Sequence, residues 1–161
     1  MPRNYHSVSI LLPDGRVFSG GGGLCYTAQV GGSTVNCNKL VDHADGQTFS
    51  PPYLFNPNGS AASRPTISAL STTSVKIGGQ LRITTSTVNP KFVLVRIGSV
   101  THSVNSDQRR VPLTTVARSG TQYTATLPKD SGILIPGHYY LFVLNAAGVP
   151  SVALTVKVTL S

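Results

Sequence analysis

Alternating apolar and polar residues in the second half of the chain restrict that half to β-structure. From position 152 to 160 the sequence reads VALTVKVTL, with an apolar residue at every second position. A period of two places successive side chains on opposite faces of a strand, so one face is buried and the other is solvated. The predicted buried face carries Val152, Leu154, Val156, Val158 and Leu160. Leu81 and Ile83 alternate with polar residues in the same way.

Two further segments, 91–97 and 139–144, are nearly continuous apolar runs, as is typical of central strands. Turn-forming pairs such as Gly78-Gly79 and Pro136-Gly137 separate the strand segments. Residues 66–161 then contain about seven strands and no helical periodicity. We therefore predict an all-β chain in which residues 66–161 form an immunoglobulin-like β-sandwich.

The first third of the chain has a different pattern, and a proline-rich connector separates it from the rest. The connector, residues 51–65, reads PPYLFNPNGSAASRP. Before it come a strand, a tight turn, a second strand, a glycine run and a third strand, at residues 6–12, 13–15, 16–19, 20–23 and 47–50. This order is similar to one blade of a kelch-type β-propeller. We divide the chain into a partial propeller at 1–55, a linker at 56–65 and the sandwich at 66–161.

A single blade leaves its sheet edges open and one apolar face uncovered, which proteins ordinarily avoid. A propeller needs about four to eight blades of about 40–50 residues each. We therefore expect residues 1–55 to pack against the remaining propeller blades of a longer parent chain.

The charge pattern argues against nucleic-acid binding, although the formal net charge is +8. The basic residues are scattered, only Arg109 and Arg110 are adjacent, and no basic stripe alternates with stacking aromatics. No stretch approaches 18 consecutive apolar residues, so we expect no membrane span. The N-terminus carries no apolar signal region, and a targeting segment of a secreted parent would lie upstream of this chain.

Cys25 and Cys37 are the only cysteines in the sequence. Two cysteines in a charge-poor chain rich in serine and threonine favour an oxidising compartment and one disulfide, hence a secreted or extracellular protein. Two free buried cysteines are the alternative.

Few residues could carry chemistry, because the chain has no glutamate and only four histidines. Asp42 and Asp45 flank His43, which fits either a small site or hydrogen bonding at a turn. His6 lies where a predicted strand begins, next to Tyr5, so both could reach one metal there. His102 lies in a polar stretch between two predicted strands. Imidazole suits copper, but ordinary hydrogen-bonded histidines explain these two positions as well.

Three segments of the chain are informative together: RNYHSVSILLPDGRVFSGGGGLC, VLVRIGSVTHSVNSDQRRVPL and LFVLNAAGVPSVALTVKV. They resemble the galactose oxidase and glyoxal oxidase family of copper radical oxidases. The first is similar to the family's final propeller blade, and the other two are similar to its C-terminal domain. The resemblance covers nearly the whole chain in the family's order. It implies an immunoglobulin-like (early-set) β-sandwich preceded by one kelch-type blade.

The resemblance also implies a ligand set for one copper ion, Cu2+. Tyr5 would be the axial tyrosine and the base that accepts the substrate's proton, and His6 and His102 would be the equatorial ligands. The family's cysteine-linked tyrosyl radical has no counterpart in this chain. The family's closely spaced cysteine pair is replaced by Cys25 and Cys37, with an insert between them.

We therefore expect a C-terminal fragment of an oxidase that converts primary alcohols or aldehydes with O2 and releases H2O2. Its substrate would be a small alcohol, aldehyde or sugar, and the fragment alone would be inactive. The alternative is a carbohydrate-binding or structural β-sandwich module, in which exposed aromatics such as Tyr123 or Tyr139 would matter and copper would not.

Overall fold

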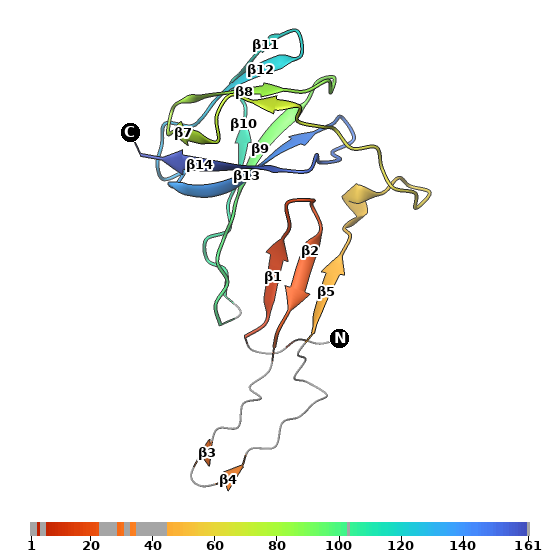
Figure 1. The fold of residues 1–161 in the computed structure, drawn as a ribbon, viewed down its shortest axis with the longest axis vertical. Coiled ribbons are helices and arrows are strands. Elements are labelled where there is room, and N and C mark those ends of the chain that lie inside the picture. The colour runs from red at the N-terminus through yellow and green to blue at the C-terminus, as the bar shows by residue number, and fades with distance from the viewer. Residues whose placement is uncertain are drawn as a thin grey trace.

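The computed structural model of the chain describes residues 3, 6–22, 29–30, 33–34, 45–102 and 104–160. Figure 1 shows a β-sandwich above a smaller N-terminal sheet, with one loop of the sandwich reaching down beside that sheet. No helix among the described residues is long and apolar enough to cross a bilayer.

The sandwich consists of two sheets, as the strand pattern predicts. The larger sheet contains, in spatial order, β10 (Arg110–Leu113), β9 (Lys91–Arg96), β13 (Gly137–Leu144), β14 (Leu154–Thr159) and β7 (Ser74–Lys76). The smaller sheet contains β11 (Val116–Ser119), β12 (Gln122–Thr126), β8 (Gln80–Thr84) and β6 (Ala69–Leu70). All of these pairs are antiparallel except β14 with β7. The region thus holds more, and shorter, strands than the expected seven.

The main core lies between the two sheets and confirms the alternation in β8. Leu81 and Ile83 are fully buried there, against Leu94 of β9 and Leu141 of β13. The two continuous apolar runs form β9 and β13, which are interior strands of the larger sheet, as predicted.

The prediction for the C-terminal strand is wrong at its ends. Val156 and Val158 are buried, but Val152, Leu154 and Leu160 are 56%, 37% and 63% exposed. Leu154 is the first residue of β14, and Val152 and Leu160 lie outside the strand. Only the middle of the strand is covered by the opposite sheet, so the alternation overstates the buried face.

The N-terminal sheet has the order β1 (Val8–Leu11), β2 (Val17–Gly20), β5 (Gly46–Phe49). A short pair, β3 (Gln29–Val30) and β4 (Ser33–Thr34), lies between β2 and β5 in the sequence. The predicted turn after β1 is present, because Gly15 N donates to Leu12 O over 2.9 Å and Gly15 has φ +81°. The three predicted strand positions of this part are therefore confirmed.

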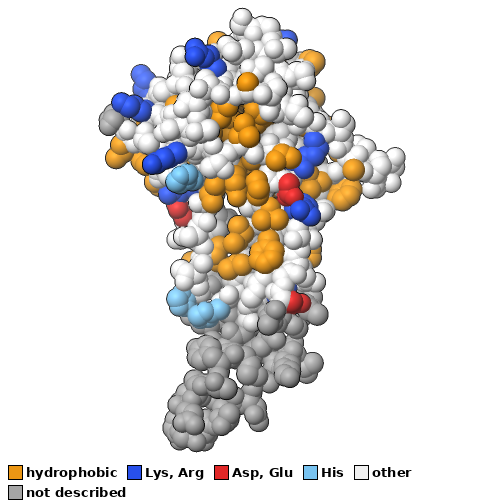
Figure 2. All heavy atoms as spheres, in the orientation of Figure 1, with side chains coloured by type: hydrophobic (Ala, Val, Ile, Leu, Met, Phe, Trp, Pro, Cys, Tyr) orange, Lys and Arg blue, Asp and Glu red, His pale blue; other side chains and the backbone are white. Residues whose placement is uncertain are grey.

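A second apolar cluster joins the N-terminal sheet to the sandwich, and we call it the seam. It consists of Val93, Phe142 and Ala153 with Leu11 of β1 packed against them. Figure 2 shows hydrophobic side chains gathered along this junction. Ala153 N donates to Pro13 O over 2.8 Å, so the backbone also connects the two parts.

The proline-rich connector, residues 51–65, is held by contacts with both the N-terminal sheet and the sandwich. It contains a short 3-10 helix, η1 (Pro52–Leu54), and Tyr53 Oη donates to Gly15 O over 2.5 Å. Arg64 donates to the carbonyl oxygens of Pro150 and Ser151 over 2.8 and 2.7 Å. These contacts and the seam hold the N-terminal sheet at a defined place under the sandwich.

Candidate metal centre

His102 lies at the tip of the loop that connects β9 to β10. Thr101 and Val104 exchange two backbone hydrogen bonds of 3.1 and 2.9 Å, which close a two-residue turn around position 102. Such tight turns need a positive φ at their first central residue, and His102 has φ +53°. A histidine held in this region costs backbone energy, which is typical of functional positions.

His6 lies just before β1 and also has a left-handed backbone, with φ +68°. The absence of a side chain at Gly21 lets the backbone of His6 approach it closely, because a Cβ at Gly21 would lie 3.2 Å from His6 O. Arg3, whose side chain is only 7% exposed, donates to Gly21 O and Asp45 O over 2.9 and 3.1 Å and pairs with Asp45 Oδ1 at 3.1 Å. This arginine ties the segment before His6 to the neighbouring ends of β2 and β5.

The two histidines meet although 95 residues separate them in the sequence. Their ring centroids are 4.8 Å apart and the ring planes are inclined by 57°. Two nitrogens that share one ion lie no more than about 4 Å apart. A centroid separation of 4.8 Å allows one nitrogen of each ring to meet that limit.

A hydrogen bond orients the His102 ring. Thr101 Oγ1 lies 2.7 Å from His102 Nδ1. In the tautomer that donates Nδ1–H to the hydroxyl, Nε2 carries the lone pair that a metal requires. The imidazole pair and this orientation fit a divalent copper ion, which prefers nitrogen ligands.

In the described part of the chain, the pair is a candidate for half of a metal site. There, no group of three or more His, Cys, Asp or Glu residues is placed to hold a metal ion. Tyr5, the third predicted ligand, lies outside the described residues, and its role stays a prediction.

The other sequence candidates contribute less. Asp45 pairs with Arg3, whereas Asp42 and His43 lie outside the described residues. Cys25 and Cys37 also lie outside them, so the disulfide stays a prediction.

The aromatic residues expected of a carbohydrate-binding module are buried. Tyr123 is 5% exposed and Tyr139 is fully buried, and both belong to the main core. The prediction that these two tyrosines are exposed is wrong, because each occupies an inward-facing position of its strand.

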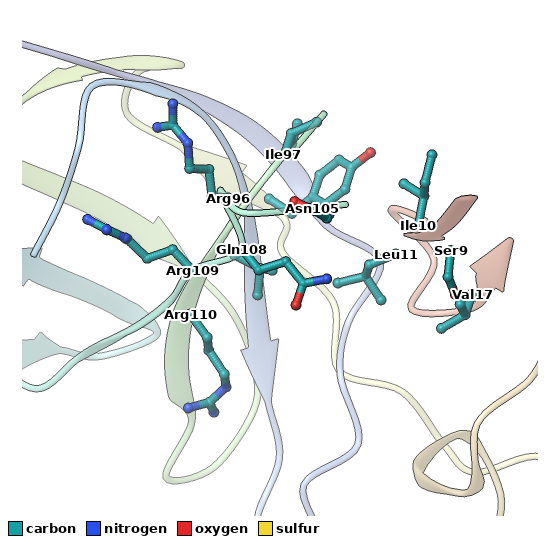
Figure 3. A pocket seen from close by; sticks show the side chains of 13 residues that line it. Ser9, Ile10, Leu11, Val17, Arg96, Ile97, Asn105, Gln108, Arg109 and Arg110 are labelled. Carbon is teal, nitrogen blue, oxygen red and sulfur yellow. The ribbon is translucent and has the colours of Figure 1, made fainter. Parts of the chain in front are cut away.

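A cavity of about 520 Å³ lies between β1 and the base of the His102 loop. Figure 3 shows the Gln108 side chain extending toward Leu11, while the guanidinium groups of Arg96 and Arg109 turn away from the N-terminal sheet. Sequence reasoning missed these arginines and Arg3, because single charged residues look like ordinary solvated side chains. The adjacent charges in the segment SDQRR were the available signal.

We expect Gly21→Ala to displace His6. Gly21 has φ +70°, so alanine costs about 1–2 kcal/mol there, and its Cβ would also press on His6 O. Gly59→Ala is the matched control, because Gly59 has φ +82° but no atom within 4 Å of the added Cβ. Both variants should lose similar stability in chemical denaturation, and only Gly21→Ala should weaken the nuclear Overhauser effect between the two histidine rings. An unchanged ring contact in Gly21→Ala would show that this close approach does not position His6.

Comparison with known proteins agrees with the fold. Residues 64–158 match the family described as "Galactose oxidase-like, Early set domain". A galactose oxidase of Gibberella zeae is 52% identical over 157 residues, which are 98% of this chain and 22% of that protein. An aldehyde oxidase (GLOX) of Vitis pseudoreticulata is 34% identical over 163 residues, covering 95% of this chain and 29% of that protein.

The solved structure of a fungal alcohol oxidase in complex with copper superimposes with a TM-score of 0.85 at 43% identity. The match covers 99% of this chain and 32% of that one. The chain therefore belongs to the galactose oxidase-like early-set family, and the resemblance seen in the sequence is confirmed. It spans about a fifth to a third of the length of these relatives.

Proposed function

We propose that this chain is the C-terminal part of a copper radical oxidase. The parent enzyme oxidises primary alcohols or aldehydes with O2 and releases H2O2. The observation that carries the proposal is the convergence of His6, next to the N-terminal sheet, and His102, on a loop of the sandwich, to a centroid distance of 4.8 Å. The relatives named galactose oxidase and aldehyde oxidase, and the copper complex of the similar structure, support it.

In this proposal His6 and His102 hold the copper ion through imidazole nitrogens, and Tyr5 is the third ligand. Copper, when bound, supplies one-electron redox chemistry between Cu(II) and Cu(I). The Tyr5 oxygen accepts the proton of the substrate's hydroxyl group, because coordination to a metal makes a phenolate available near neutral pH. Oxidation of an alcohol removes two electrons, so a second one-electron acceptor must come from the parent chain outside these 161 residues.

The proposal also assigns the N-terminal sheet a place in the parent protein. In the parent it is the last kelch-type blade of a β-propeller, and the remaining blades cover its open edges, β1 and β5. The parent is secreted into an oxidising environment, in which a disulfide between Cys25 and Cys37 would persist. A disulfide and a secreted location are compatible with the low share of charged residues, 11% of the chain.

The test compares the parent protein with the 161-residue chain. The copper-loaded parent should oxidise a primary alcohol or an aldehyde, consume O2 and release an equal amount of H2O2, and a copper chelator should abolish turnover. The chain alone should show no turnover.

Two results would contradict the proposal. One is a parent that keeps full turnover after copper is removed. The other is a parent without any oxidase activity whose isolated sandwich binds oligosaccharides, which would favour the carbohydrate-binding alternative.

A further inference from the structure

The loop that carries His102 is held at its base by an arginine–carboxylate pair. Arg96 is the last residue of β9, and its Nε donates to Asp107 Oδ2 over 2.5 Å, across the base of the loop. The same guanidinium donates through Nη1 to Ile135 O and Pro136 O over 3.0 and 2.8 Å. The hydrogen bond with Asp107 raises the pKa of Arg96, so the group stays charged.

A second arginine, at the other end of the loop, binds the same segment, residues 132–136. Arg109 immediately precedes β10, and its Nη1 donates to Gly132 O and Ile133 O over 2.6 and 3.1 Å. Arg96 N also donates to Arg109 O over 2.8 Å, which closes the loop at its base. Two arginines that flank the loop therefore bind four carbonyl oxygens within residues 132–136.

The Arg96 guanidinium occupies space that is left open by the absence of a side chain at Gly137. Gly137 has φ +149°, and a Cβ there would lie 2.5 Å from Arg96 Nη1. The Arg96 guanidinium also lies 5.5 Å from the ring centre of Tyr139, which is fully buried and donates its hydroxyl to Ile135 O over 2.6 Å. The binding place of the guanidinium is thus anchored in the main core.

The loop's own hydrogen bonds do not explain its direction. The pair between Thr101 and Val104 lies within the loop, so it fixes the shape of the tip but not where the tip points. The contacts of Arg96, Asp107 and Arg109 join the base of the loop to the sandwich. A change in angle at the base moves the tip most, because the tip lies farthest from it.

We propose that Arg96, Asp107 and Arg109 form a brace that directs the His102 loop onto His6. They are positioning residues, because their hydrogen bonds join one another and residues 132–136, and they act on His102 through the loop. The inference rests on the proposed function for its purpose, since the brace would hold a copper ligand in place. The contacts themselves are properties of the sandwich.

The test uses variants of the 161-residue chain with a matched control. Arg109→Ala and Asp107→Ala each remove brace contacts, whereas Arg110→Ala removes the same charge as Arg109→Ala from the next residue. No hydrogen bond or ion pair joins the Arg110 side chain to the described residues. Three quantities are measured: amide hydrogen exchange of residues 97–106, the Overhauser effect between the rings of His6 and His102, and the thermal midpoint.

We expect Arg109→Ala and Asp107→Ala to speed exchange in residues 97–106 by about tenfold or more, the effect of losing a charged hydrogen bond. The ring contact should weaken, while the thermal midpoint shows that the sandwich remains folded. Asp107→Asn keeps an acceptor for Arg96 and should fall between Asp107→Ala and the unaltered chain. Arg110→Ala should match the unaltered chain. With Cu(II) added, the brace variants should bind about 10- to 100-fold more weakly, as other changes behind a metal ligand do.

Wild-type exchange and ring contact in Arg109→Ala and Asp107→Ala would overturn the brace, whatever the copper result. An equal effect of Arg110→Ala would also overturn it, because the change would then follow charge alone. Failure of the unaltered chain to bind Cu(II) through nitrogen ligands would count against the proposed function instead. In that case the exchange and ring-contact measurements still decide the brace.

Discussion

Replacing His102 will abolish specific Cu(II) binding without unfolding the sandwich. His102 lies at an exposed loop tip, so its side chain contributes little to the core. Loss of a direct ligand should weaken binding by more than the about 10- to 100-fold that loss of a ligand's outer partner costs. His102→Asn is the preferred variant, because asparagine tolerates the left-handed backbone that this turn requires. His6→Asn should have the same effect for the same reason.

Electron paramagnetic resonance of Cu(II) added to the chain is the measurement, with His138→Asn as the control. His138 is an exposed histidine of β13 in the same sandwich, but it lies in register with Lys157 and not at the loop tip. The unaltered chain and His138→Asn should give a stoichiometric signal with coupling to two nitrogen ligands. Wild-type affinity and coupling in His102→Asn would show that His102 is not a ligand.

How far the sequence predicts the fold depends on the strand. In β8 the alternation of Leu81 and Ile83 with polar residues predicts the buried face correctly, because the strand crosses the middle of the core. In the C-terminal strand the alternation continues beyond the area covered by the opposite sheet, so Val152 and Leu160 are exposed. Periodicity shows which residues share a face, but not how much of that face a partner covers.

The continuous apolar runs indicate that both faces of a strand are buried, and not only that the strand is central in its sheet. In β9, Phe92 and Leu94 face the main core, while Val93 faces the seam. Both faces of this strand are therefore buried, one by the smaller sheet and the other by the N-terminal sheet. The sequence contains that signal, but it does not say which other part of the chain covers the second face.

The candidate site is the least predictable part. Periodicity and spacing alone leave His6 and His102 as two separate polar residues, and only the family resemblance joins them. The turn at Thr101–Val104 is local, but the seam and the proposed brace are tertiary contacts, which periodicity does not predict. The brace has a weak signal in the sequence, because Asp107 and Arg109 give no hint that their partners lie in β9 and in residues 132–136.

Two neighbouring residues of β13 allow the role of the seam to be separated from that of the core. Leu141 is fully buried in the main core, and Phe142 is 4% exposed on the opposite face, in the seam with Val93 and Ala153. The seam also borders a largely apolar cavity of about 330 Å³ that Leu11 and Phe142 help to line. Truncating Leu141 or Phe142 should therefore lower the stability substantially. The loss should affect the sandwich core for Leu141 and the docking of the N-terminal sheet for Phe142.

Leu141→Ala should lower the free energy of unfolding of the sandwich by about 2–5 kcal/mol, as cavity-forming core substitutions do. Phe142→Ala removes a comparable or larger apolar contact, worth about 3–5 kcal/mol, chiefly from the docking of the N-terminal sheet. Chemical denaturation, followed by hydrogen exchange in β1 and β2 and by the Overhauser effect between the rings of His6 and His102, distinguishes the two.

Below the denaturation midpoint, Leu141→Ala should keep the ring contact, because the seam is intact in every folded molecule. Phe142→Ala should lose that contact, and with it Cu(II) affinity, while the amides of β9 and β13 stay protected. A ring contact retained in Phe142→Ala would mean that the connector contacts of Tyr53 and Arg64 suffice to hold the N-terminal sheet in place. The histidine pair would then depend on the connector and the brace, and the seam would contribute stability only.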